Sequence, residues 1–107
     1  MKVIDSGHEY ELSELGSDNT QILKFIKRSG GTVQYSGEHA GLQTQEVLRA
    51  LIDRTKYLDS IIPCRETKEA IKHLQMALYW YEVRAQRRKK EKVDRTTDTH
   101  DDANTPE

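Results

Sequence analysis

Cysteine and long hydrophobic runs are nearly missing from this chain, and each shortage excludes a class of protein. One cysteine among 107 residues allows no internal disulfide and fits a reducing compartment. One cysteine and four scattered histidines form no metal-ligand pattern, so we expect no metal and no other cofactor. No apolar run approaches the roughly 20 residues that span a bilayer, so a membrane is not an expected partner. Residues 1–10 carry no apolar signal-peptide core, so export is not expected.

Apolar residues are also scarce overall. They make up 35% of the chain, and charged residues make up 33%. Typical globular proteins have about 45–50% apolar and about 25% charged residues. The length corresponds to one domain, and small domains bury the smallest fraction of their surface. We therefore expect a homo-oligomer, because assembly compensates for a thin core.

The net charge of −1 hides two blocks of opposite sign. Residues 84–92 hold six basic side chains against one acidic side chain, a local charge of +5. Residues 93–107 hold five acidic side chains against Arg95, a local charge of −4. A basic helix end can hold phosphates, whereas an acidic terminus without aromatic residues stays solvated. We expect residues 93–107 to be a disordered tail.

Two patterns divide the rest of the chain and predict an α+β fold. Alternating apolar residues predict strands at 8–12, 21–28 and 32–35, with a glycine turn between the last two, and hence a small antiparallel β-meander over about 8–36. A period of 3.6 residues predicts one helix from Thr44 to about Ser60 and another from about 65–67 to Lys90. Pro63 separates them, and so short a turn makes them an antiparallel hairpin over about 44–91. We expect one domain over residues 1–92.

The second helix carries two separate faces. We expect one to pack on the first helix through Ala70, Ile71, Leu74, Ala77, Leu78, Tyr81 and Ala85. Met76 and Trp80 lie on another face and are candidates for an oligomer interface, although core packing explains them equally well. Arg84 and Arg88 follow one turn apart, and guanidinium groups bind phosphates with bidentate hydrogen bonds. An ion pair of Arg84 with Glu82 or Asp53 is the structural alternative.

A second candidate site surrounds the predicted turn, where Arg54, Tyr57, Arg65, Glu66 and Thr67 gather. The ring of Tyr57 offers a surface on which a nucleotide base can stack. Unpaired N–H groups at the start of the second helix, around Glu66 and Thr67, can bind an anion. The alternative for Tyr57 is an amphipathic residue at the rim of the core.

Enzyme motifs are missing. The sequence has no glycine-rich phosphate loop before a helix, no nucleophile elbow and no histidine pair on a helix. Cys64 would need an adjacent base to act as a nucleophile, and as a structural residue it fits a helix-capping turn. We expect no catalytic residues and no enzymatic activity.

The order of these segments resembles a known family. It is similar to the phage Thoeris anti-defence sponges, whose helical hairpin is shared with the phage anti-CBASS cyclic-nucleotide sponges. The resemblance rests on 45–58, on Pro63-Cys64-Arg65-Glu66-Thr67, and on the apolar positions from Ala70 to Ala85 around Arg84. The strand segments 8–12 and 21–26 and the closing Thr99-His100 are typical of the Thoeris branch.

The resemblance implies a protein that sequesters a signal in the host cytoplasm and does not degrade it. Members bind a cyclic nucleotide immune signal, which is a glycocyclic ADP-ribose isomer in the Thoeris branch. Some also bind cyclic di- and trinucleotides. They assemble as dimers or hexamers with ligands between subunits.

By motif position, Tyr57 would stack on adenine, Thr67 would help hold the ligand, Arg84 and Arg88 would bind phosphates, and Arg54 would support them. Thr67 and Asp59 stand where related chains often carry asparagine. An amide and a hydroxyl offer different hydrogen bonds, so the exact signal stays open. Two other interpretations are a nucleic-acid-binding module that uses residues 84–92, and a purely structural hairpin.

Overall fold

The computed structural model describes residues 1–28 and 38–94, which form two compact units with a boundary after Gln43. The first unit is a β-sheet and the second is a helical hairpin, which confirms the α+β fold. Each unit is described by itself. The prediction of a single domain over 1–92 stays a prediction, and the tail beyond residue 94 and the predicted strand 32–35 lie outside the described residues.

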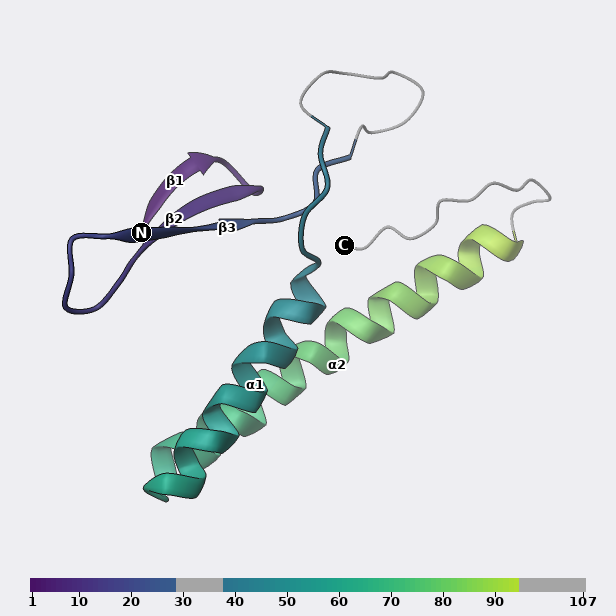
Figure 1. Ribbon diagram of the computed structural model, residues 1–107. Coiled ribbons are helices and arrows are strands. Elements are labelled where there is room, and N and C mark those ends of the chain that lie inside the picture. Colours follow the sequence, from purple (N-terminus) through teal and green to yellow (C-terminus); the bar gives the residue numbers. More distant parts are fainter. Residues whose placement is uncertain (29–37, 95–107) are drawn as a thin grey trace. The chain divides into compact units, whose positions relative to one another are not determined.

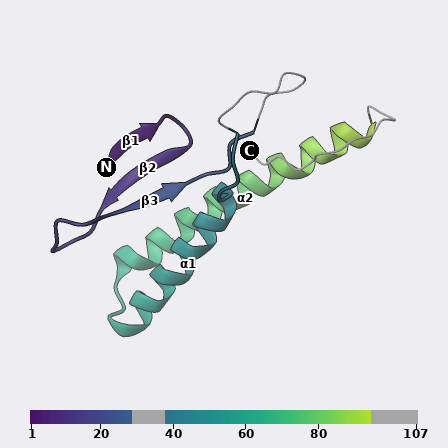
Figure 2. The same ribbon diagram turned by 45° about the horizontal axis from the view of Figure 1, so that its top comes forward.

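The first unit contains a three-stranded antiparallel meander in the order β1-β2-β3 (Figures 1 and 2). Its strands are β1 (Lys2–Asp5), β2 (Glu9–Ser13) and β3 (Thr20–Lys24). Tyr10 of β2 lies opposite Val3 on one side and Leu23 on the other, so one face of the sheet carries a cross-strand apolar row. The meander was predicted to begin at about residue 8, and this was wrong. The four residues of β1 are too short a run to show alternation by sequence.

After β3, residues 25–27 pair with residues 39–42 of the same unit. We call this pairing the crossing. Phe25 forms a bridge with Leu42, and Lys27 forms a bridge with His39, with two backbone hydrogen bonds of 3.0 Å. Gly41 lies so close to this crossing that a Cβ atom built on it would be 2.5 Å from the carbonyl carbon of Phe25. The predicted strand 21–28 therefore ends at Lys24 and continues as isolated bridges.

An ion pair fastens β1 to the crossing. The Lys27 ammonium donates a hydrogen bond of 2.9 Å to Asp5 Oδ2. This hydrogen bond is the largest cause that lowers the pKa of Asp5 below its ordinary value. Phe25 packs edge-on against Tyr10, with ring centroids 6.1 Å apart. The crossing and the meander therefore share both an apolar and an ionic contact.

The second unit is the hairpin of α1 (Thr44–Ile61) and α2 (Arg65–Asp94), which lie side by side in both views (Figures 1 and 2). Both helices begin and end close to their predicted bounds, and Pro63 lies in the connection between them. With 30 residues against 18, α2 is longer and extends past the start of α1 by about 18 Å. No helix within 1–28 and 38–94 is long and apolar enough to cross a membrane.

The contact between the two helices is narrow. Among the described residues, Ile52 is the one buried apolar side chain, with 9% of its surface exposed. The half-buried apolar residues of α2 are those expected to face α1: Ile71, Leu74, Ala77, Leu78 and Ala85. Ala70 and Tyr81, which were predicted to be buried with them, are exposed. Two helices alone cannot enclose a core, because each can bury only the stripe that faces the other.

Candidate functional site

The turn of the hairpin is held by one carboxylate at the end of α1. Asp59 Oδ1 accepts a 2.6 Å hydrogen bond from the hydroxyl of Thr67 and a 3.1 Å bond from the N–H of Cys64. The Lys68 ammonium binds the other oxygen, Oδ2, at 2.9 Å. Asp59 therefore ties the end of α1 to the first turn of α2. The structure places Cys64 in this helix-capping turn, as its structural interpretation predicted.

These bonds stabilise the ionised form of Asp59 and lower the pKa of its carboxyl group to about 2. The hydrogen bond from Thr67 is the largest cause, followed by those from Lys68 and Cys64. Since 18% of the Asp59 side chain is exposed, the cluster stays within reach of solvent.

The contribution of Asp59 to stability should depend on pH. The folded pKa of about 2 lies below the unfolded value of about 3.9. The stabilisation is therefore full above about pH 5 and falls as the pH drops through 4 toward 2. We expect the difference in melting temperature between wild type and Asp59→Asn to be largest at neutral pH and to shrink in acid. Asp53→Asn, also on α1, is the control, and an equal pH-dependent difference for it would contradict the assignment.

The side chains of Thr67 and Asp59 contact each other. The hydroxyl proton of Thr67 is donated to Asp59, and the same hydroxyl lies 3.1 Å from the Cys64 carbonyl oxygen. A hydroxyl has one proton. Toward a ligand, Thr67 can therefore act only as an acceptor while its bond to Asp59 is intact.

The other residues predicted at the turn are exposed. Arg65 and Glu66 lie in the first turn of α2, where helix N–H groups are open to an anion. Tyr57 is 62% exposed on the last turns of α1. It follows Ile52 by five residues, so it points about 140° away from the side that meets α2. Arg54 is exposed on the same outer side of α1.

Arg84 and Arg88 lie at the opposite end of the hairpin. Arg84 is half-buried and Arg88 is exposed, and four residues place them about 6 Å apart along the helix axis. Glu82, a predicted partner of Arg84, forms an ion pair with Arg49 of α1. The structure therefore separates the candidate residues into a turn group and an arginine pair. Thr67 and Arg84 are about 25 Å apart along α2.

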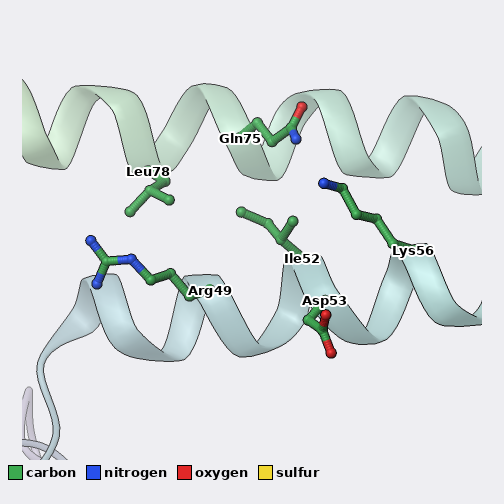
Figure 3. Close-up of a pocket in the computed structure, with 6 residues that line it drawn as sticks. All are labelled: Arg49, Ile52, Asp53, Lys56, Gln75 and Leu78. Atoms are coloured by element: carbon green, nitrogen blue, oxygen red, sulfur yellow. The ribbon is translucent and has the colours of Figure 1, made fainter.

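A shallow groove of about 290 Å³ runs between the helices on one face of the hairpin. Ile52 and Leu78 point toward each other across it, and Lys56 extends from α1 toward α2 (Figure 3). Arg49, Asp53 and Gln75 complete the lining. The sequence analysis did not single out this groove, because its residues come from two helices and form no motif.

The opposite face of the hairpin is apolar. Arg49 and Lys56 of α1 and Gln75 of α2 line the groove. Two positions after them in the sequence come Leu51, Leu58 and Ala77, respectively. Two positions correspond to about 200° around a helix, so these three lie on the other side. Leu51 is 43% exposed and Leu58 is 39% exposed. We call this surface the apolar face: Val47, Leu51, Leu58, Ile62, Ala70, Ala77 and Tyr81.

A second exposed stripe follows the side of α2 that faces away from α1. Met76 and Trp80, the predicted interface residues, are 54% and 59% exposed. Tyr79 packs edge-on against Trp80, with ring centroids 5.1 Å apart. We call Met76, Tyr79, Trp80 and Val83 the back stripe.

Gln45 is a residue that the sequence analysis did not identify. It is 7% exposed at the start of α1, and within the described part of the chain its Oε1 atom has no hydrogen-bond partner. A buried carbonyl oxygen without a donor is destabilising by about 1–3 kcal/mol. No sequence signal marks it, since glutamine in the first turn of a helix is ordinary.

Comparisons with family models, curated proteins and solved structures find no match for this chain. Among residues 1–28 and 38–94, no three His, Cys, Asp or Glu side chains are grouped so that they could hold a metal ion.

Proposed function

We propose that this protein is a phage anti-defence sponge, which binds a cyclic nucleotide immune signal in the host cytoplasm and does not degrade it. The proposed ligand is a glycocyclic ADP-ribose isomer, and the proposal extends to cyclic di- and trinucleotides of CBASS-type signalling. Sequestration keeps the signal from the Thoeris effector. The observation that carries the proposal is the pair Arg84 and Arg88, one helical turn apart at the end of an exposed apolar face.

Two guanidinium groups at this spacing suit a ligand with two neighbouring phosphates. Each guanidinium presents a planar set of donors, and its bonds to phosphate are charge-assisted. Side chains four residues apart on a helix share one face, so both can reach one ligand. A ligand of this kind also offers an adenine, for which the exposed ring of Tyr57 is a stacking surface.

One chain cannot bring all these residues to one small ligand. The turn group and the arginine pair lie about 25 Å apart along α2. A site that uses Tyr57, Thr67, Arg84 and Arg88 together therefore requires a second copy of the chain. The exposed apolar residues of the hairpin favour such an assembly.

Calorimetry with a panel of glycocyclic ADP-ribose isomers and cyclic di- and trinucleotides tests the proposal. We expect saturable binding of at least one, and recovery of the unchanged compound after the complex is heated. Recovery of a modified compound would indicate an enzyme. The alternative, a nucleic-acid-binding module using residues 84–92, predicts affinity for oligonucleotides that falls steeply with salt, because many counterions are released. Binding of a small diphosphate in a pocket should lose much less affinity as the salt concentration rises.

A further inference from the structure

We propose that Gln45 is a ligand-binding residue, and that its side-chain carbonyl accepts a hydrogen bond from a free sugar hydroxyl next to the phosphates bound by Arg84 and Arg88. This inference rests on the proposed function and extends it to another part of the same ligand. The arginine pair binds the phosphates of the signal, and Gln45 recognises its sugar.

Gln45 lies on the side of α1 that faces α2. It precedes Ile52 by seven residues, or almost two helical turns, so the two side chains leave the helix only about 20° apart. Ile52 points toward Leu78 of α2 across the groove (Figure 3). The Gln45 side chain is therefore directed toward α2, which agrees with its exposed fraction of 7%.

An ion pair between the helices fixes the level of Gln45 along α2. Arg49 of α1 pairs with Glu82 of α2. Gln45 lies one turn before Arg49, and one turn back along α1 corresponds to one turn forward along the antiparallel α2, at residues 85–86. Ala85, which is half-buried, lies at this level. Because alanine has no polar side-chain group, it offers the Gln45 carbonyl no donor.

The arginine pair lies at the same end of the hairpin. Arg84 precedes Ala85 directly, and Arg88 follows it by three residues, so both are within one helical turn of the level of Gln45. Arg84 is half-buried, as Ala85 is. A ligand whose phosphates bind the arginine pair therefore brings the adjoining sugar to the start of α1.

Gln45 supplies a hydrogen-bonding group that the arginine pair lacks. Guanidinium groups only donate hydrogen bonds, so Arg84 and Arg88 can bind phosphate oxygens but cannot accept the proton of a hydroxyl. A neutral amide carbonyl accepts that proton without repelling the phosphates, as a carboxylate at this position would. The ribose of a cyclic nucleotide is esterified to its phosphates, so its remaining hydroxyls lie next to them.

The buried state of the carbonyl gives the proposal a distinctive energetic signature. In the described part of the chain, Gln45 Oε1 is buried and has no hydrogen-bond partner, which destabilises the free protein. Rotating the amide toward a ligand hydroxyl breaks no hydrogen bond of Oε1 and gives this atom a donor. Removing the carbonyl should therefore stabilise the free protein and weaken ligand binding. A residue with a purely structural role would not change the two quantities in this way.

Gln45→Met tests the proposal, because methionine keeps the approximate length of the side chain and removes the carbonyl. We expect the melting temperature of the ligand-free variant to rise by roughly 4 °C or more. Calorimetry with the glycocyclic ADP-ribose isomer that wild type binds most tightly should show an affinity about tenfold lower, because the sugar hydroxyl loses a strong acceptor.

Gln75→Met is the matched control. It makes the same replacement at an exposed glutamine of α2 and should change neither the melting temperature nor the affinity. A stabilised Gln45→Met that binds as tightly as wild type would overturn the proposal. A lower melting temperature would overturn it too, since it would show that the carbonyl is paired in the folded protein. Failure of wild type to bind any isomer would contradict the proposed function itself, so the two failures are distinguishable.

Discussion

Replacing Arg84 with alanine is expected to weaken binding of a glycocyclic ADP-ribose isomer by about tenfold to a hundredfold. Each charge-assisted hydrogen bond to phosphate contributes about 1.5–3 kcal/mol. Arg88 alone cannot replace the hydrogen bonds that the Arg84 guanidinium donates. Arg84→Lys should restore only part of the affinity, because a point charge substitutes for a planar pair of donors. Calorimetry gives the affinities, and circular dichroism checks that helix content is unchanged.

Lys89→Ala is the matched control for this series. Lys89 belongs to the same basic segment and is exposed, but it lies outside the predicted arginine pair. A pocket around Arg84 and Arg88 predicts almost no effect of this change on the cyclic nucleotide. Equal losses for Arg84→Ala and Lys89→Ala would contradict the pocket and support a surface that binds nucleic acid.

Replacing Gly41 with alanine is expected to open the crossing in the sheet unit. The new Cβ atom would lie 2.5 Å from the Phe25 carbonyl carbon, 2.6 Å from its oxygen and 2.7 Å from the Ile26 nitrogen. These are backbone atoms, so the contact cannot be relieved by rotating a side chain. Overpacking of this kind is destabilising by about 1–3 kcal/mol. Exchange of the Ile26 and Leu42 amides, which donate hydrogen bonds across the crossing, should accelerate about tenfold or more.

Gly16 provides the control, because an added side chain there has space, unlike at Gly41. It has a φ of 85°, and nothing lies within 4 Å of an added Cβ. Gly16→Asn should leave exchange at the crossing unchanged, because asparagine tolerates the left-handed region and meets no neighbour there. Exchange rates in Gly41→Ala equal to those of wild type would contradict this prediction. They would show that residues 25–27 and 39–42 can move apart with little loss of stability.

The helices were predictable because their signals are local and repeated. The 3.6-residue period and Pro63 give the type and approximate bounds of both α1 and α2. The sheet was harder. The crossing of 25–27 with 39–42 depends on contacts between segments far apart in sequence, and Gly41 looks like an ordinary loop glycine until a neighbouring backbone is placed beside it. The exposure of Ala70 and Tyr81 also depends on how narrow the contact with α1 is.

The candidate site was predictable in its residue types but not in its arrangement. The basic run containing Arg84 and Arg88 is visible in the sequence, and so is the cluster at the turn. Their separation along α2 follows only from the single unbroken helix over Arg65–Asp94. The bond from Thr67 to Asp59 could not be predicted, because it requires the end of α1 and the start of α2 to meet within hydrogen-bond distance.

The position of the single tryptophan gives this molecule a built-in optical label. Trp80 lies on the back stripe, 59% exposed, on another side of α2 than the apolar face. A dimer through the apolar face leaves the indole in water, so its emission stays red-shifted and iodide quenches it at all protein concentrations. Contact through the back stripe would instead shift the emission to the blue and protect the indole as the subunits associate. A dilution series of the unmodified protein thus reports which side of α2 is covered.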